Sequence, residues 1–227
     1  MNLQLVLFDL DGTLADTAVD IARATNLALA EAGRPSLGIE HVRARVSMGA
    51  RGLIVSSFTE GKATEDEIEH LTRRLFAHYA EVPARHTRVF EGMEDLLGDL
   101  GRMEVPWGVV SNKPEALVRP IVTELSLEPA PVCMMGGDST ARKKPDPLPL
   151  LHACEMADVA PARALYVGDA EIDVQAARAA GMPVAIAGFG YAPQAGIVGT
   201  WSPDCYADSV ETLRNYVASL HDAPLSA

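Results

Sequence analysis

The strongest constraint on the fold is an alternation of short apolar runs with helical segments along the chain. The runs are rich in Val, Leu and Met, and most segments between them space their apolar residues as one face of a helix does. Alternation of this kind is typical of a parallel sheet with helices on both faces, so the sequence predicts an α/β fold. The predicted strands are Leu3–Phe8, Val105–Ser111, Val132–Met135, Ala164–Val167 and Val184–Ala187.

The interval between the first two predicted strands is longer than one crossover helix requires. Ala18–Ala32 is rich in Ala and Leu and ends at a glycine and a proline, which is a typical helix stop. In Glu65–Glu81, apolar residues recur every three or four positions. We therefore expect residues 1–16 and 87–227 to form the core, and residues 17–86 to form a small helical insert after the first strand.

The charge balance excludes two classes of partner. Lys and Arg total 19 against 31 Asp and Glu, a net charge of −12 that repels nucleic acid and anionic membranes. No run approaches the roughly 18 apolar residues of a membrane span, and the three cysteines show no CxxC spacing. We expect a folded cytoplasmic protein, monomeric or homodimeric, that acts on a small molecule.

The first predicted strand ends in two carboxylates, Asp9 and Asp11, within the segment LVLFDLDGTLAD. Side chains at positions i and i+2 of an extended chain point to the same side. The two acids can therefore converge at the carboxyl edge of the sheet, where open α/β sheets bind ligands. Gly12 then permits a sharp turn, and Thr13 can offer a hydroxyl or an amide to an anion. Alone, this pattern fits a plain Asp-Gly turn equally well.

A second pair of acids follows a later strand. Ala164–Val167 leads into Gly168 and Asp169, and Asp173 follows four residues on, so the two acids share a face if a helix begins there. Helix capping would explain one of the two. It would not explain why two strands each end in paired acids, because gathered carboxylates repel unless a cation neutralises them. Hard oxygen ligands in small number suit Mg²⁺, so the sequence predicts a magnesium site.

Two further strand ends carry groups that complement such a site. Ser111, Asn112 and Lys113 follow one strand, and Lys144 lies in the segment RKKPDP. A hydroxyl and an ammonium beside a magnesium–carboxylate site suit a phosphoryl group, whose charge lies on its equatorial oxygens. Each signal alone also fits a turn hydroxyl or a solvated lysine. The agreement of four strand ends favours a phosphate site.

The segments FDLDGTLAD, VVSNKP, KKPDP and GDAEID resemble the four motifs of the haloacid dehalogenase-like hydrolases in order and spacing, and the resemblance covers the whole chain. It implies a Rossmann-like core and makes the helical insert the α-helical cap domain of phosphoglycolate phosphatase-like members. It also implies a Mg²⁺-dependent phosphatase that hydrolyses a small phosphorylated metabolite through an aspartyl-phosphate.

The resemblance also implies the role of each site residue. Asp9 would be the nucleophile and Asp11 the general acid and base. Members of the family that dehalogenate lack an acid at the position of Asp11, so its presence favours phosphoryl chemistry. The implied metal-binding residues, with Asp11 acting through its backbone carbonyl and Asp173 in support, are Asp9, Asp11, Asp169 and Asp173. The implied phosphate-binding residues are Thr13, Ser111, Asn112 and Lys144.

The substrate stays open at this stage. Arg51, between two glycines in VSMGARGL, could pair with a substrate carboxylate, and it fits a solvated helix face equally well. Lys113 is a similar candidate at the junction of insert and core. The leading hypothesis is a phosphoglycolate phosphatase-like enzyme. The alternative is an N-acetylmuramic acid 6-phosphate phosphatase of cell-wall recycling, because VSMGAR, FEGM and WGVVSNKP also resemble that subgroup.

Two alternatives belong to other classes of protein. A sugar phosphomutase would share the core residues and retain the phosphoryl group. A non-catalytic phosphate-binding module would have no need of Asp11.

Overall fold

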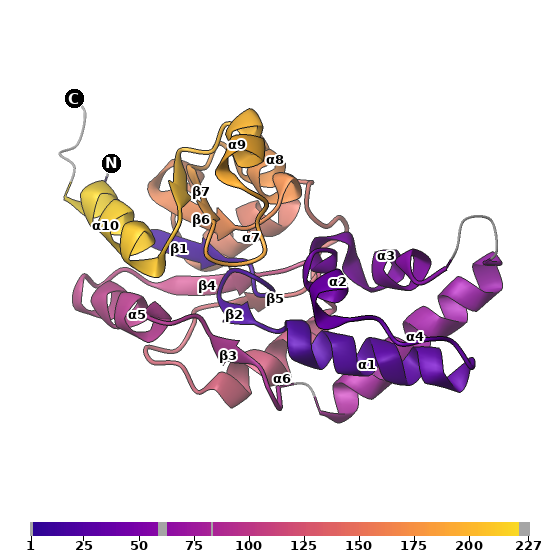
Figure 1. The fold of residues 1–227 in the computed structure, drawn as a ribbon. Helices are drawn as coiled ribbons and strands as arrows, with labels where there is room; N and C mark the ends of the chain where they lie inside the picture. Colours follow the sequence, from indigo (N-terminus) through magenta and orange to yellow (C-terminus); the bar gives the residue numbers. More distant parts are fainter. Residues whose placement is uncertain (1, 59–62, 83, 223–227) are drawn as a thin grey trace.

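The computed structural model describes residues 2–58, 63–82 and 84–222 (Figure 1). They form a core of one parallel sheet covered by helices, with further helices gathered at one side of it. The predicted α/β fold with a small helical insert is confirmed. Within these residues no helix is both long and apolar enough to cross a bilayer.

The main sheet has six parallel strands within the described residues. From one edge to the other they are β5 (Met134–Met135), β4 (Trp107–Val110), β1 (Leu5–Phe8), β6 (Ala164–Gly168), β7 (Val184–Ala187) and β8 (Cys205–Ala207). The chain leaves β1 toward one edge and later returns to β6 on its other side. The carboxyl end of β1 therefore lies at the point where the strand order reverses, which is where sheets of this kind bind ligands.

Successive side chains of β1 enter two separate apolar layers. Leu5 and Leu7 pack with α7 and α8 on one face, whereas Val6 and Phe8 pack with α5, α6 and α10 on the other. All four are fully buried, which explains why the strand reads as a continuous apolar run. The core helices are α5 (Met93–Arg102), α6 (Glu115–Leu125), α7 (Leu148–Met156), α8 (Glu171–Ala179), α9 (Ala195–Val198) and α10 (Val210–His221), and the short 3-10 helices are η2 (Pro161–Arg163) and η3 (Gly199–Trp201).

The helical insert lies beyond the carboxyl edge of the sheet (Figure 1). It contains α1 (Ala18–Glu31), α2 (Ile39–Arg43), η1 (Val46–Met48), α3 (Gly49–Ser56) and α4 (Glu65–Glu81). Helices α1 and α4 pack along one another. Helix α4 begins at a capping box, in which Thr64 and Glu67 satisfy each other's backbone N–H groups, and the side chains of its apolar stripe are buried.

Two linkers join the insert to the core side by side. The two-residue strands β2 (Ala15–Asp16) and β3 (Arg88–Val89) pair antiparallel, one in each linker. This pairing supports residues 17–86 as the extent of the insert, which we keep as a proposal.

The structure differs from the sequence-based expectation at several strands. Strand β4 spans only Trp107–Val110, and β5 only Met134–Met135, so both are shorter than predicted. Strand β8 was not predicted, because Cys205–Ala207 is three residues long and partly exposed. Strands β2 and β3 are too short to show any periodicity.

Candidate active site

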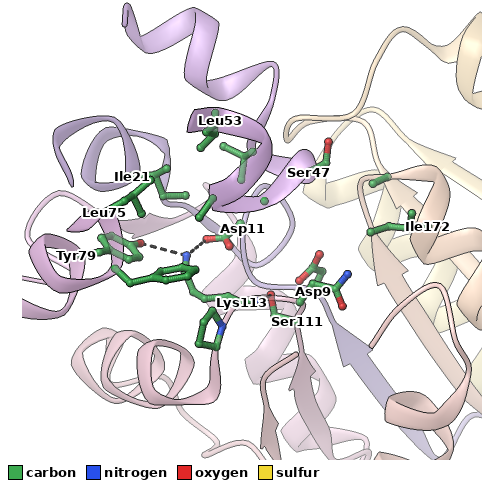
Figure 2. Close-up of a pocket in the computed structure, with 17 residues that line it drawn as sticks. Asp9, Asp11, Ile21, Ser47, Leu53, Leu75, Tyr79, Ser111, Lys113 and Ile172 are labelled. Atoms are coloured by element: carbon green, nitrogen blue, oxygen red, sulfur yellow. Dashed lines mark hydrogen bonds and ion pairs between the residues drawn. The ribbon is translucent and has the colours of Figure 1, made fainter. Parts of the chain in front are cut away.

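The acids and the serine predicted from the sequence meet at one edge of the sheet. Asp9 follows β1, Ser111 follows β4 and Asp169 follows β6, and these three strands are neighbours. A pocket that is partly open to solvent lies between this edge and the insert (Figure 2). Its core lining is Asp9, Asp11, Ser111, Asn112, Lys113, Pro114, Ala170 and Ile172, and its insert lining is Ile21, Val46, Ser47, Gly49, Ala50, Leu53, Leu75, Phe76 and Tyr79.

Three carboxylates form a tight cluster at the base of this region. Asp9, Asp169 and Asp173 each place one oxygen within 4.8 Å of the other two. Burial raises the pKa of Asp9, and Lys144 opposes that rise only in part. Burial raises the pKa of Asp169 well above its usual range, and the charges of Asp173 and Asp9 raise it further. Buried oxygens that resist ionisation together are a donor set that fits a hard divalent cation such as Mg²⁺.

The carboxylate of Asp173 is already committed to protein partners. Its Oδ1 accepts from Lys144 Nζ at 2.8 Å, and its Oδ2 accepts from the backbone N–H groups of Asp169 and Ala170 at 3.1 and 3.0 Å. A Cβ on Gly168 would lie 2.4 Å from this carboxyl group, so only glycine permits the approach. Asp173 therefore positions Asp169 just before α8, and Asp9 and Asp169 are the members of the cluster that could hold a metal.

Lys144 is a fully buried ammonium group beside the predicted nucleophile. Its Nζ lies 3.0 Å from Asp9 Oδ2, and it donates to the hydroxyl of Tyr166 at 2.5 Å. The Tyr166 hydroxyl in turn donates to Val110 O at 2.9 Å. Burial alone would lower the pKa of Lys144, but the carboxylates of Asp173 and Asp9 outweigh burial and raise it to about 12. Lys144 thus keeps its positive charge next to Asp9 at neutral pH.

Asp11 is held by two donors on the pocket wall. Its Oδ1 accepts from Lys113 Nζ at 2.5 Å and from Thr17 Oγ1 at 2.6 Å. Lys113 also donates to the hydroxyl of Tyr79 at 3.3 Å, and Figure 2 shows this chain of contacts from α4 of the insert to Asp11 in the core. Lys113 therefore lines the pocket as predicted from its position, but its ammonium group is already paired.

The remaining predicted residues lie in different places. Ser111 and Asn112 line the pocket, and Asn112 Nδ2 donates to Lys144 O at 2.9 Å, which ties two of the motif segments together. Thr13 is fully buried outside the lining, and its hydroxyl has no hydrogen-bond partner among the described residues. Arg51 is not brought to the pocket. Its side chain is 53% exposed and pairs with Glu65 at 2.8 Å, because it points away from the face of α3 that lines the pocket.

Sequence reasoning missed three residues that contact the predicted site. Thr17 binds Asp11, Tyr79 binds Lys113, and Tyr166 binds Lys144. In the sequence, Tyr79 is an ordinary position of the apolar stripe of a helix, and Tyr166 is an ordinary position of a buried strand. The available signal was that a buried tyrosine hydroxyl requires a polar partner, which in this fold lies at the pocket.

Comparisons with known proteins agree with this geometry. Residues 6–187 match the model of the haloacid dehalogenase-like hydrolase family. An N-acetylmuramic acid 6-phosphate phosphatase of Pseudomonas putida is 35% identical, covering 96% of this chain and 98% of its own length. A phosphoglycolate phosphatase of Xanthomonas campestris is 39% identical, covering 82% of this chain and 83% of its own.

A solved structure shares the fold over nearly the whole length. The crystal structure of a protein from Haemophilus somnus, described as a predicted phosphoglycolate phosphatase, superposes with a TM-score of 0.81 at 27% identity and covers 96% of this chain and 99% of its own. The family match spans most of the chain, and the curated relatives exceed 30% identity. The chain therefore belongs to the haloacid dehalogenase-like hydrolase family.

Proposed function

We propose that the protein is a Mg²⁺-dependent phosphatase that hydrolyses a small phosphomonoester through an aspartyl-phosphate on Asp9. The observation that carries this proposal is the placement of Asp9. Its carboxylate lies at the edge of the pocket, 3.0 Å from the ammonium group of Lys144 and within the carboxylate cluster that includes Asp169. A nucleophile, a fixed positive charge and a metal site in one place are the requirements of phosphoryl transfer.

The first half of the reaction uses Asp9 and Asp11. An oxygen of Asp9 forms a bond to phosphorus as the ester P–O bond breaks, and Asp11 gives its proton to the departing alcohol oxygen. Lys144 and Ser111 stabilise the charge on the phosphoryl oxygens. Asp9, Asp169 and the backbone carbonyl of Asp11 would hold Mg²⁺, which supplies further positive charge beside the phosphoryl group.

The second half of the reaction regenerates the enzyme. Asp11 now takes a proton from water as the water oxygen bonds to phosphorus, and the bond between phosphorus and Asp9 breaks. Free phosphate leaves, and Asp11 is again protonated for the next cycle. The contacts that Thr17 and Lys113 make with Asp11 fix its direction for both steps.

The test is phosphate release in the presence of Mg²⁺, measured on a panel that includes phosphoglycolate and N-acetylmuramic acid 6-phosphate. We expect turnover by the unmodified protein, reversible loss of turnover on chelation, and no measurable turnover by Asp9→Asn or Asp11→Asn with unchanged circular dichroism. Isomer formation without free phosphate would instead indicate a mutase. Unchanged phosphate release by Asp9→Asn would contradict the proposed nucleophile.

Phosphoglycolate is the first candidate substrate, because several curated relatives are named phosphoglycolate phosphatases. The insert wall of the pocket favours the second candidate, N-acetylmuramic acid 6-phosphate. That wall is almost entirely apolar, and among the described lining residues the cationic side chain is Lys113, which already pairs with Asp11. A carboxylate next to the phosphate ester would find no free cation there, whereas methyl groups and a sugar ring would contact the apolar wall. The higher kcat/KM within the panel decides between the two substrates.

A further inference from the structure

We propose that Tyr191 is a positioning residue that holds the helical insert over the pocket by fixing the first linker to the core. Tyr191 lies in the segment GFGYAP, in the loop that follows β7. It belongs to neither the carboxylate cluster nor the pocket lining. Its contacts nevertheless reach both linkers and the turn that carries Asp11.

The hydroxyl of Tyr191 bridges the two ends of the first linker. It donates to Asp16 Oδ1, at the end of β2, and accepts from the backbone N–H of Ala18, at the start of α1, at 2.8 Å. Without this hydroxyl, the Ala18 N–H and Asp16 Oδ1 would retain only their mutual contact of 3.3 Å. One oxygen atom of the core thus sets the direction in which the chain enters the insert.

The carboxylate of Asp16 extends this contact into the insert. Its second oxygen, Oδ2, accepts from Arg43 Nη2 of α2 at 3.0 Å. The guanidinium carbon of Arg43 also lies 5.9 Å from the centre of the Tyr191 ring. Asp16 is therefore shared between a donor from the core and a donor from the insert, and the position of one constrains the other.

The ring of Tyr191 is fixed by the turn between Asp11 and Thr13. Gly12 has φ +80°, and a Cβ added to it would lie 2.4 Å from the Tyr191 ring. A Cβ on Gly190 would lie 1.7 Å from Gly12 O. The two glycines allow the loop to lie directly on this turn. Contacts with the core therefore fix the position of the Tyr191 hydroxyl.

Aromatic contacts link the same loop to the second linker. The Tyr191 ring packs edge-on against Phe90, directly after β3, with 6.4 Å between ring centres, and Phe90 packs on Phe189 at 5.3 Å. Both linkers therefore rest on one short loop of the core. When two domains move apart, the backbone dihedral angles of the linkers change. Because both linkers contact this loop, we infer that the loop controls the position of the insert.

The test compares Tyr191→Phe, which keeps the ring and removes the hydroxyl, with Tyr216→Phe on α10 as the matched control. We expect the Ala18 amide of Tyr191→Phe to exchange its hydrogen up to about tenfold faster, the scale of one hydrogen bond to a neutral acceptor. Amides of β1 and β6 should exchange as in the unmodified protein, and Tyr216→Phe should change none of these rates. This measurement requires no turnover, so it stands apart from the proposed function.

Kinetics give a second readout on the best phosphomonoester of the panel. If the insert spends less time over the pocket, the apparent affinity falls in proportion to the competent fraction, so Tyr191→Phe should raise KM about tenfold and leave kcat within twofold. General loss of folded protein would lower kcat instead. Equal KM values for Tyr191→Phe and Tyr216→Phe would overturn the proposal.

A double-mutant cycle with Asp16→Ala separates the contact from the two side chains. If Tyr191 holds the insert through Asp16, the double variant should show no higher KM than Asp16→Ala alone. Additive effects would show that Tyr191 acts by another route and would overturn the proposal. Unchanged exchange at Ala18 in Tyr191→Phe would do the same.

Discussion

Neighbouring carboxylates in this site differ in whether hydrogen-bond donors of the protein compensate their charge. Asp173 is fully buried and has a hydrogen-bond donor on each oxygen, including the ammonium group of Lys144. Burial raises the pKa of Asp169, and the charges of two neighbouring acids, Asp173 and Asp9, raise it further. The charge of Asp173 is therefore compensated within the chain, whereas Asp169 is the carboxylate at which the proposed Mg²⁺ would bind.

Substitution of each acid by its amide should reveal this difference in the metal-free protein. Asp173→Asn removes the closer of the two carboxylates that pair with the buried Lys144 and should lower the free energy of unfolding by up to about 3–5 kcal/mol. Asp169→Asn removes a repelled charge and should raise it. Urea unfolding in the presence of a chelator measures both. Loss of stability in both variants would show that Asp169 is compensated by partners in the protein.

A second prediction concerns Lys113, which we regard as a positioning residue for Asp11. Lys113→Met keeps an apolar side chain and removes the 2.5 Å contact, so Asp11 retains Thr17 as its donor. We expect kcat for an alkyl phosphate to fall about 10- to 100-fold, within the range of general acid–base catalysis. For p-nitrophenyl phosphate, whose leaving group needs less protonation, the loss should be several times smaller. Equal losses on both substrates would indicate that Lys113 acts on the phosphate instead.

At the scale of elements, α3 presents adjacent residues to different surroundings. Ala50 lines the pocket, whereas Arg51 is half exposed and pairs with Glu65 at the start of α4. Ala50→Leu should fill part of the pocket and raise KM at least about fivefold for the larger panel substrates, with a smaller effect on phosphoglycolate. Arg51→Gln should leave KM within twofold, because the Arg51 side chain is exposed and does not line the pocket. A large KM increase in Arg51→Gln would restore its predicted role as a carboxylate-binding residue.

The strand ends were predictable because the signal there is local. A buried apolar run that stops at a carboxylate specifies both the strand and the edge at which the acid lies, and the structure brings Asp9, Ser111 and Asp169 to that edge. The direction of the Arg51 side chain was not predictable. Helical spacing assigns a residue to one face of a helix only when both ends of the helix are known, and the apolar residues of η1 and α3 show no strong helical period. Tyr191 was missed because its partners Asp16 and Ala18 are more than 170 residues away in sequence.

At the scale of the whole molecule, stability should depend on pH and metal together. In the metal-free fold the pKa values of Asp9 and Asp169 are raised above 3.8, the usual value for Asp. Between pH 3.8 and these raised pKa values, the folded state therefore binds more protons than the unfolded chain. Stability then decreases with rising pH, since its slope follows protons bound in the unfolded state minus those in the folded state. Other acids contribute in the opposite direction, notably Glu31, whose pKa is lowered to about 2 by Arg74 and His78.

The Mg²⁺-dependent part of the unfolding free energy isolates the contribution of the carboxylate cluster. A divalent cation binds the ionised carboxylates and displaces their protons, so saturating Mg²⁺ should stabilise the protein little at pH 4.5 and progressively more toward pH 8. The measurement is the difference in unfolding free energy with Mg²⁺ and with chelator across this range. In Asp169→Asn the difference should be smaller and flatter, because one ligand is neutral at every pH. A gain from Mg²⁺ that is equal at all pH values would show that the cation binds elsewhere on this acidic chain.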